Sequence, residues 1–129
     1  MNIPEGLLYT KEHEWIKIEG DTGTIGITDY AQSALGDVTF VELPQMGDEL
    51  KQFEPFASVE SVKAVSDIYA PMSGKVIKLN EQLSTSPELL NQSPYEEGWL
   101  VVIEISDEKE KENLMSAAEY KQYLEGLSA

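Results

Sequence analysis

The order of apolar and polar residues along the chain predicts mostly β-strands. In residues 14–28, EWIKIEGDTGTIGIT, isoleucine occupies alternate positions on each side of a break at Gly20. A period of two is that of a strand, and a Gly-Asp break between two such runs indicates a hairpin. The stretches DVTFVEL, SGKVIKLN and GWLVVIEI predict further strands. Short strands at this spacing are typical of a barrel or a sandwich, so we expect a mainly β fold.

Two stretches predict short helices instead. DYAQSALG follows Thr28, a favoured helix N-cap residue, and ends in glycine, a favoured helix terminator. Near the C-terminus, Ser116 and Glu119 have the spacing of a capping box and begin a run with one apolar stripe. We expect a helix over about 116–125 that docks on the strands.

The stretch SVESVKAVSDIYAPMSG, residues 58–74, is harder to assign. Valine or isoleucine recurs at every third position, which by itself would permit a helix. Pro55 and Pro71 bracket the stretch, however, and its β-branched residues favour strands. We therefore expect two strands that meet near residues 62–65, with Lys63 at the hairpin tip. The turn is unusual because it has no Gly or Asn to supply a positive φ.

Three roles for Lys63 are compatible with this position. It could be a solvated charge between aliphatic neighbours. It could be a Schiff-base nucleophile, but Glu60 and Asp67 would keep its amine protonated, which disfavours that role. It could also be an attachment point for a group, which requires only exposure and a rigid base.

Composition narrows the possible functions. The 129 residues fit one domain, and a net charge of −15 disfavours nucleic acid and anionic membranes as partners and favours basic proteins. The chain has no cysteine and one histidine, His13, so we expect no metal site, and sulfur chemistry would require an attached group. No signal peptide or apolar span is evident, so we expect a cytoplasmic location; a mature mitochondrial form would look the same.

Four stretches of the sequence resemble those of a known family. VESVKAVSDIYAPMSGKV is similar to the lipoylation motif of glycine cleavage system H proteins, with the modified lysine at Lys63. YTKEHEWI, GITDYAQSALGDVTFVELPQMGDEL and SPYEEGW resemble further landmarks of this family, in the expected order along the chain. The resemblance implies a barrel-sandwich hybrid of the lipoyl/biotinyl type, a single domain over residues 1–129 with the lipoyl hairpin at about 56–70.

The same resemblance implies a carrier, not an enzyme. Lipoate attached to Lys63 would receive the aminomethyl group of glycine from a pyridoxal-phosphate decarboxylase and pass it to an aminomethyltransferase that uses tetrahydrofolate. Dihydrolipoamide dehydrogenase would then reoxidise the dithiol. A lipoate-attaching enzyme would recognise Glu60, Val62 and Ala64 beside the lysine, and a carrier of this size is expected to be a monomer.

When the lipoyl arm carries the aminomethyl group, a carboxylate beside it would hold the terminal amine of that group. Glu12, Glu14 and Asp67 are candidates, and resemblance to the HEW landmark favours Glu14. For His13 we expect a structural role. For Tyr95 and the two tryptophans we expect packing roles.

Two alternatives remain open at this stage. One is a lipoyl carrier, or a relay of lipoate itself, for another acyl-transfer complex. The other is an unmodified acidic binding module, because a sequence records a site and not its occupancy.

Overall fold

The computed structural model describes residues 1–128, and within them nine strands form two antiparallel sheets. The larger sheet has the strand order β1-β2-β3-β9-β8-β5 and the smaller one β4-β6-β7. The strands are β1 (Leu8–Tyr9), β2 (Glu14–Glu19), β3 (Thr22–Ile27), β4 (Val38–Glu42), β5 (Glu49–Leu50), β6 (Pro55–Ser61), β7 (Val65–Tyr69), β8 (Gly74–Leu79) and β9 (Val101–Ile105). The helices are α1 (Asp29–Leu35), α2 (Leu89–Gln92) and α3 (Ala117–Ser128), with 3₁₀ turns η1 (Glu81–Ser84) and η2 (Glu108–Asn113).

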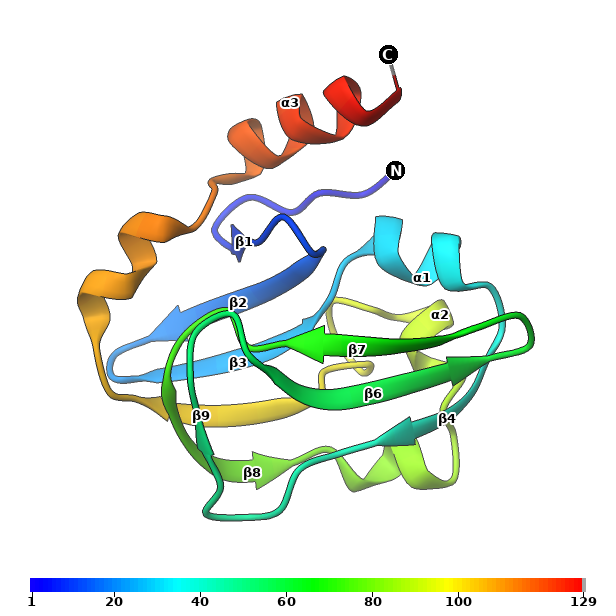
Figure 1. Ribbon diagram of the computed structural model, residues 1–129, viewed down its shortest axis with the longest axis horizontal. Coiled ribbons are helices and arrows are strands. Elements are labelled where there is room, and N and C mark those ends of the chain that lie inside the picture. The colour runs from blue at the N-terminus through cyan, green and yellow to red at the C-terminus, as the bar shows by residue number, and fades with distance from the viewer. Residues whose placement is uncertain (129) are drawn as a thin grey trace.

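The main core lies between the two sheets. Ile25 and Ile103 reach it from the larger sheet, and Val59 and Ile68 reach it from the smaller one; all four side chains are buried. Figure 1 shows the smaller sheet in front of the larger, with α1 at one end of both. The prediction of a mainly β fold with short helices is confirmed.

A second core lies under the C-terminal helix. Figure 1 shows α3 on one side of the molecule, next to the N-terminal segment and β1. The Tyr120 ring of α3 stacks on the Tyr9 ring with 4.7 Å between centroids. This cluster covers the outer side of β2, where Trp15 is buried, while Glu14 and Ile16 are buried on the opposite side of the strand, which faces the main core. The strict alternation of inside and outside that the sequence predicts for β2 therefore fails at its first three residues.

Both predicted helix starts have the expected hydrogen bonds. The Thr28 hydroxyl accepts a bond from the Ala31 amide at the start of α1. Before α3, the Ser116 amide donates to the Glu119 carboxylate, and the Glu119 amide donates to the Ser116 hydroxyl. These are the two reciprocal bonds of a capping box.

Candidate functional site

The hairpin between β6 and β7 has a turn that a serine closes. The Ser61 amide donates to the Ala64 carbonyl oxygen at 2.8 Å. The Ser61 hydroxyl accepts bonds from the amides of Ala64, at 3.1 Å, and Lys63, at 3.3 Å. No residue of this turn has a positive φ, so the turn needs neither Gly nor Asn. Ser61 was not among the residues predicted from the sequence, although serine is favoured at the first position of such turns.

The tip is also anchored to the rest of the protein. The Val62 amide donates to the Asp37 carbonyl at 3.1 Å. Asn91, from α2, fixes the residues around Asp37: its side chain donates to the Gly36 carbonyl at 2.8 Å and accepts from the Val38 amide at 2.9 Å. Two segments distant in sequence therefore hold the turn in place.

Lys63 lies at the tip of this hairpin, where the sequence predicted it. Its side chain is exposed and extends across Gly36 at the end of α1. Gly36 has φ +79°, and a Cβ atom there would lie 3.1 Å from Lys63 Cε. Glycine thus provides both the backbone conformation that ends α1 and the space for the lysine stem. Glu60, Val62 and Ala64 are exposed around it.

A groove begins beside Lys63 and follows β7. It has a volume of about 420 Å³. One wall is α1, through Ala31, Ala34 and Leu35, and the other wall is residues 64–69 of the hairpin. The groove ends at Glu12 and His13. At roughly 3.3 Å per strand residue, the part along β7 is about 13 Å long.

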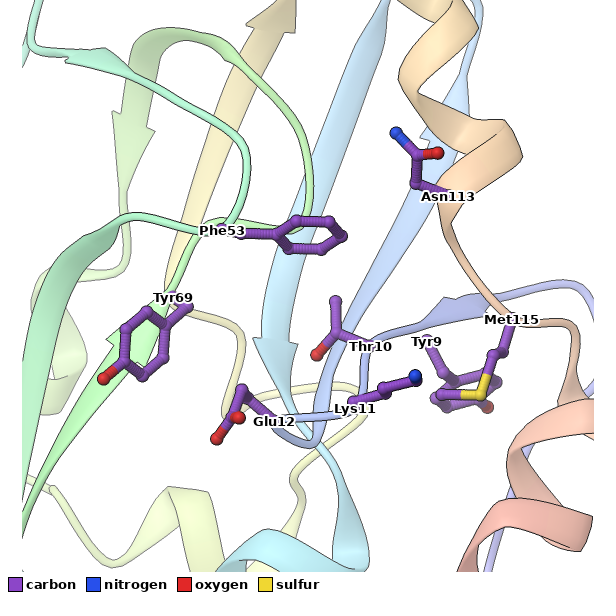
Figure 2. Close-up of a pocket in the computed structure, with 8 residues that line it drawn as sticks. All are labelled: Tyr9, Thr10, Lys11, Glu12, Phe53, Tyr69, Asn113 and Met115. Atoms are coloured by element: carbon purple, nitrogen blue, oxygen red, sulfur yellow. The ribbon is translucent and has the colours of Figure 1, made fainter.

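A second cavity, of about 460 Å³, adjoins the far end of the groove. Glu12 and Tyr69 line both spaces. Figure 2 shows the Phe53 ring pointing into this second cavity, between Tyr69 and Asn113. The lining residues are Tyr9, Thr10, Lys11, Glu12, Phe53, Tyr69, Asn113 and Met115.

The three candidate carboxylates have different environments. Glu12 and Asp67 are exposed and line the groove. Glu14 is only 1% exposed and lines neither space. The Thr10 hydroxyl donates to Glu14 Oε1, and the Tyr69 amide donates to Oε2 at 3.1 Å. Burial raises the pKa of Glu14 to about 7, although these two hydrogen bonds oppose the shift.

His13 connects the end of the groove to the second core. Its Nδ1 lies 2.8 Å from the Tyr120 hydroxyl, which also lies 2.8 Å from the Thr28 hydroxyl. Its ring packs against Tyr30 with 4.4 Å between centroids, and burial lowers its pKa. These contacts agree with the structural role predicted for His13, and its φ of +73° shows that they hold a strained backbone.

The aromatic residues near the groove also make packing contacts. Trp15 Nε1 donates to the carbonyl oxygens of Ile27 and Pro94, at 2.9 and 3.0 Å. The Tyr95 hydroxyl accepts from the Asp29 amide at 2.9 Å. Their predicted roles in core and loop packing match these contacts.

Comparisons with known proteins identify the family. The family model for the glycine cleavage H-protein matches residues 7–126. Glycine cleavage system H proteins of Halothermothrix orenii and Halalkalibacterium halodurans are 60% and 58% identical to this chain; the alignments cover 97% and 95% of it and 98% and 96% of the relatives.

A solved structure agrees with this match. The crystal structure of a glycine cleavage system H protein from Mycobacterium marinum superposes with a TM-score of 0.83 at 36% identity, over 93% of this chain and 97% of that one. Among the described residues, no helix has the length and apolar character that crossing a membrane requires. The chain belongs to the glycine cleavage H-protein family, the lipoyl carriers of the glycine cleavage system, which hold lipoate on a lysine and do not themselves catalyse its reactions.

Proposed function

We propose that Lys63 is the lysine that carries lipoate in this protein. One observation supports this assignment above others: the Lys63 amine is exposed at the tip of an anchored hairpin, at the entrance of a groove that can receive a long apolar chain. Lipoate supplies the dithiolane that accepts the aminomethyl group, which a chain without cysteine could not otherwise provide. The protein partners of this carrier are the decarboxylase, the aminomethyltransferase and the dihydrolipoamide dehydrogenase of the system.

The groove is the proposed resting place of the loaded arm, by which we mean the lipoyl-lysine bearing the aminomethyl group. Its α1 wall of Ala31, Ala34 and Leu35 suits the methylenes of the arm. The end of the groove lies near carboxylates, which attract the protonated terminal amine. Partial exclusion of water there would also slow loss of the amine.

The three carboxylates would contribute in different ways. We infer that Glu12 and Asp67 contact the amine directly, because both line the groove. Glu14, which the resemblance to the HEW landmark favours, would attract the amine without contacting it, because its two oxygens already accept bonds from Thr10 and Tyr69. A cationic amine nearby favours the charged form of a carboxyl group, so arrival of the loaded end would lower the raised pKa of Glu14 and strengthen the attraction.

Four further proposals concern recognition, domain organisation, oligomeric state and location. Glu60, Val62 and Ala64 form part of what the lipoate-attaching enzyme recognises, since they surround Lys63 on the exposed side of the hairpin. Residues 1–129 act as one lipoyl-carrier domain and as a monomer. The bacterial origin of its relatives from Halothermothrix orenii and Halalkalibacterium halodurans supports a cytoplasmic location.

Peptide mass mapping of protein from its native host tests the assignment of Lys63. The expected result is the lipoyl mass increment on the peptide with Lys63 and on no other lysine. Lys75 and Lys78, whose side chains are exposed on strand β8, are the informative alternatives. Modification of either of them, with Lys63 unmodified, would overturn the proposal.

A further inference from the structure

Exposed apolar side chains surround Lys63 on the outer face of the smaller sheet. Val62 is 70% exposed, Val65 is 68% exposed and Phe40 is 50% exposed. The strand register places Phe40 of β4 opposite Glu60 of β6, and Glu60 opposite Val65 of β7. Phe40 therefore stands in the same row as the residues next to the lysine, although it is far from them in sequence.

A β-bulge turns Phe40 toward solvent. In a regular strand Val38 and Phe40 would point to the same face, because side chains alternate with a period of two. The pairing of β4 with β6 shifts between these two residues, and Val38 and Val41 are buried while Phe40 is exposed. Bulges often redirect a side chain beside a functional site. The strand thus leaves a large aromatic ring in water that regular alternation would bury.

Acidic residues border this apolar row. The next row across the sheet places Glu42 opposite Ser58 and Ser58 opposite Asp67. Glu42, Glu60 and Asp67 are all exposed. An apolar centre with an acidic border fits a partner surface with an apolar centre and a basic border.

We propose that this face docks the enzyme that attaches lipoate to Lys63. We call it the tip face and define it as Phe40, Glu42, Glu60, Val62 and Val65. The proposal rests on the assignment of Lys63 above and adds Phe40, Glu42 and Val65 to the recognition residues.

The attaching enzyme fits this face better than the other partners do. It must recognise the hairpin before any arm exists, so it can use only side chains fixed around the lysine. The three enzymes of the cleavage system act instead on the far end of a long arm. The tip face lies at the entrance of the groove, whereas the groove ends at Glu12 and His13.

Lipoylation kinetics of the unmodified protein test the proposal. A purified lipoate–protein ligase, with lipoic acid and ATP, is combined with the wild type, Phe40→Ser and Val65→Thr, and intact mass records the modification. We expect Phe40→Ser to lower kcat/KM by about tenfold or more, mainly through a higher KM, because a central aromatic residue is a common binding hot spot. Val65→Thr should act in the same direction with a smaller effect.

Two comparison variants make the result specific. Ile77→Ser removes an apolar side chain that is 40% exposed on β8, in the other sheet, and should leave kcat/KM unchanged. Phe40→Leu should recover most of the lost efficiency. Thermal unfolding of each variant shows whether the fold is intact, and Val65→Thr serves if Phe40→Ser does not fold.

Either of two outcomes would overturn the proposal. One is a kcat/KM for both tip-face variants within twofold of the wild type. The other is normal lipoylation of Phe40→Ser combined with slow glycine–bicarbonate exchange by its lipoylated form, which would assign the face to the decarboxylase. Lipoate on a lysine other than Lys63 in the wild type would refute the site assignment itself, and mass mapping distinguishes this case.

Discussion

The two ends of the groove are built in opposite ways. At the entrance, the residues around Lys63 are exposed, and the Ser61 turn and the Val62–Asp37 bond hold them in place. At the far end, Glu14 and Trp15 are buried. Tyr9 of β1 and Tyr120 of α3 belong to the same cluster as Trp15, and the Thr10 hydroxyl and the Tyr69 amide bond to Glu14.

Because of this difference, residues at the entrance can be changed for function without loss of stability, whereas residues at the far end cannot. Side chains at the entrance add little to the core, so they can serve recognition and attachment. At the far end, His13 lines the groove and also contacts Tyr120 of the second core, so changes there affect the fold as well. Four predictions test this contrast, from the largest expected effect to the smallest.

Replacing Lys63 should abolish function without affecting the fold. Lys63→Arg keeps the positive charge but cannot form the lipoyl amide. We expect no glycine–bicarbonate exchange when the variant, after incubation with the lipoate–protein ligase, is added to the decarboxylase. The free energy of unfolding should change by less than about 0.5 kcal/mol, because the side chain is exposed. Exchange near the wild-type rate would contradict the assignment.

Replacing Trp15 should destabilise the protein strongly. Its side chain is 1% exposed and its Nε1 donates to two carbonyl oxygens. Trp15→Ala should therefore lower the free energy of unfolding by about 3–5 kcal/mol. Urea unfolding measures this change, with Trp99→Ala, at a half-buried position, as the matched comparison. A loss no larger than that of Trp99→Ala would show that the far end is not a core.

Glu14 should make stability depend on pH. Its pKa is about 7 in the folded protein, against 4.5 for an ordinary glutamate, so the unfolded chain loses this proton first as pH rises. The Glu14 contribution to the free energy of unfolding is therefore greatest below about pH 4.5, falls between 4.5 and 7, and is constant above. The full fall is about 3 kcal/mol at most.

Glu14→Gln cannot titrate, so this fall should be missing from the variant. Urea unfolding of both proteins from pH 4.5 to 7.5 measures the difference between their curves, which cancels the contribution of other carboxylates. Parallel curves would mean that Glu14 has an ordinary pKa in the folded protein.

Removing single carboxylate charges should have the smallest effects. Glu12→Gln and Asp67→Asn should each speed loss of the amine from the loaded carrier a few-fold, because an exposed charge pair contributes on the order of 1 kcal/mol or less. Glu14→Gln should also speed this loss while lipoylation of Lys63 changes little. Decay of isolated loaded protein, followed by mass, measures the three rates. A variant that decays as the wild type does would exclude its carboxylate from holding the amine.

Local patterns were sufficient to predict the elements that local interactions determine. The β2–β3 hairpin of residues 14–28, the Thr28 cap and the Ser116–Glu119 capping box each involve residues close in sequence, and the structure contains all three. The position of Lys63 at a hairpin tip followed from β-branched residues between two prolines. These features could be predicted because backbone geometry and neighbouring side chains define them.

The sequence by itself thus determined the seven longer strands, the starts of α1 and α3, and the exposed lysine. Only the tertiary structure decided which side chains around them are accessible, because burial depends on elements far away in the chain. Trp15 is buried by the second core under α3, and Glu14 is buried where Thr10 and Tyr69 bond to it, although alternation treats both like any other strand residues. The bulge against β6 exposes Phe40 beside a lysine 23 positions away, and no local pattern reports a shift in register between two distant strands.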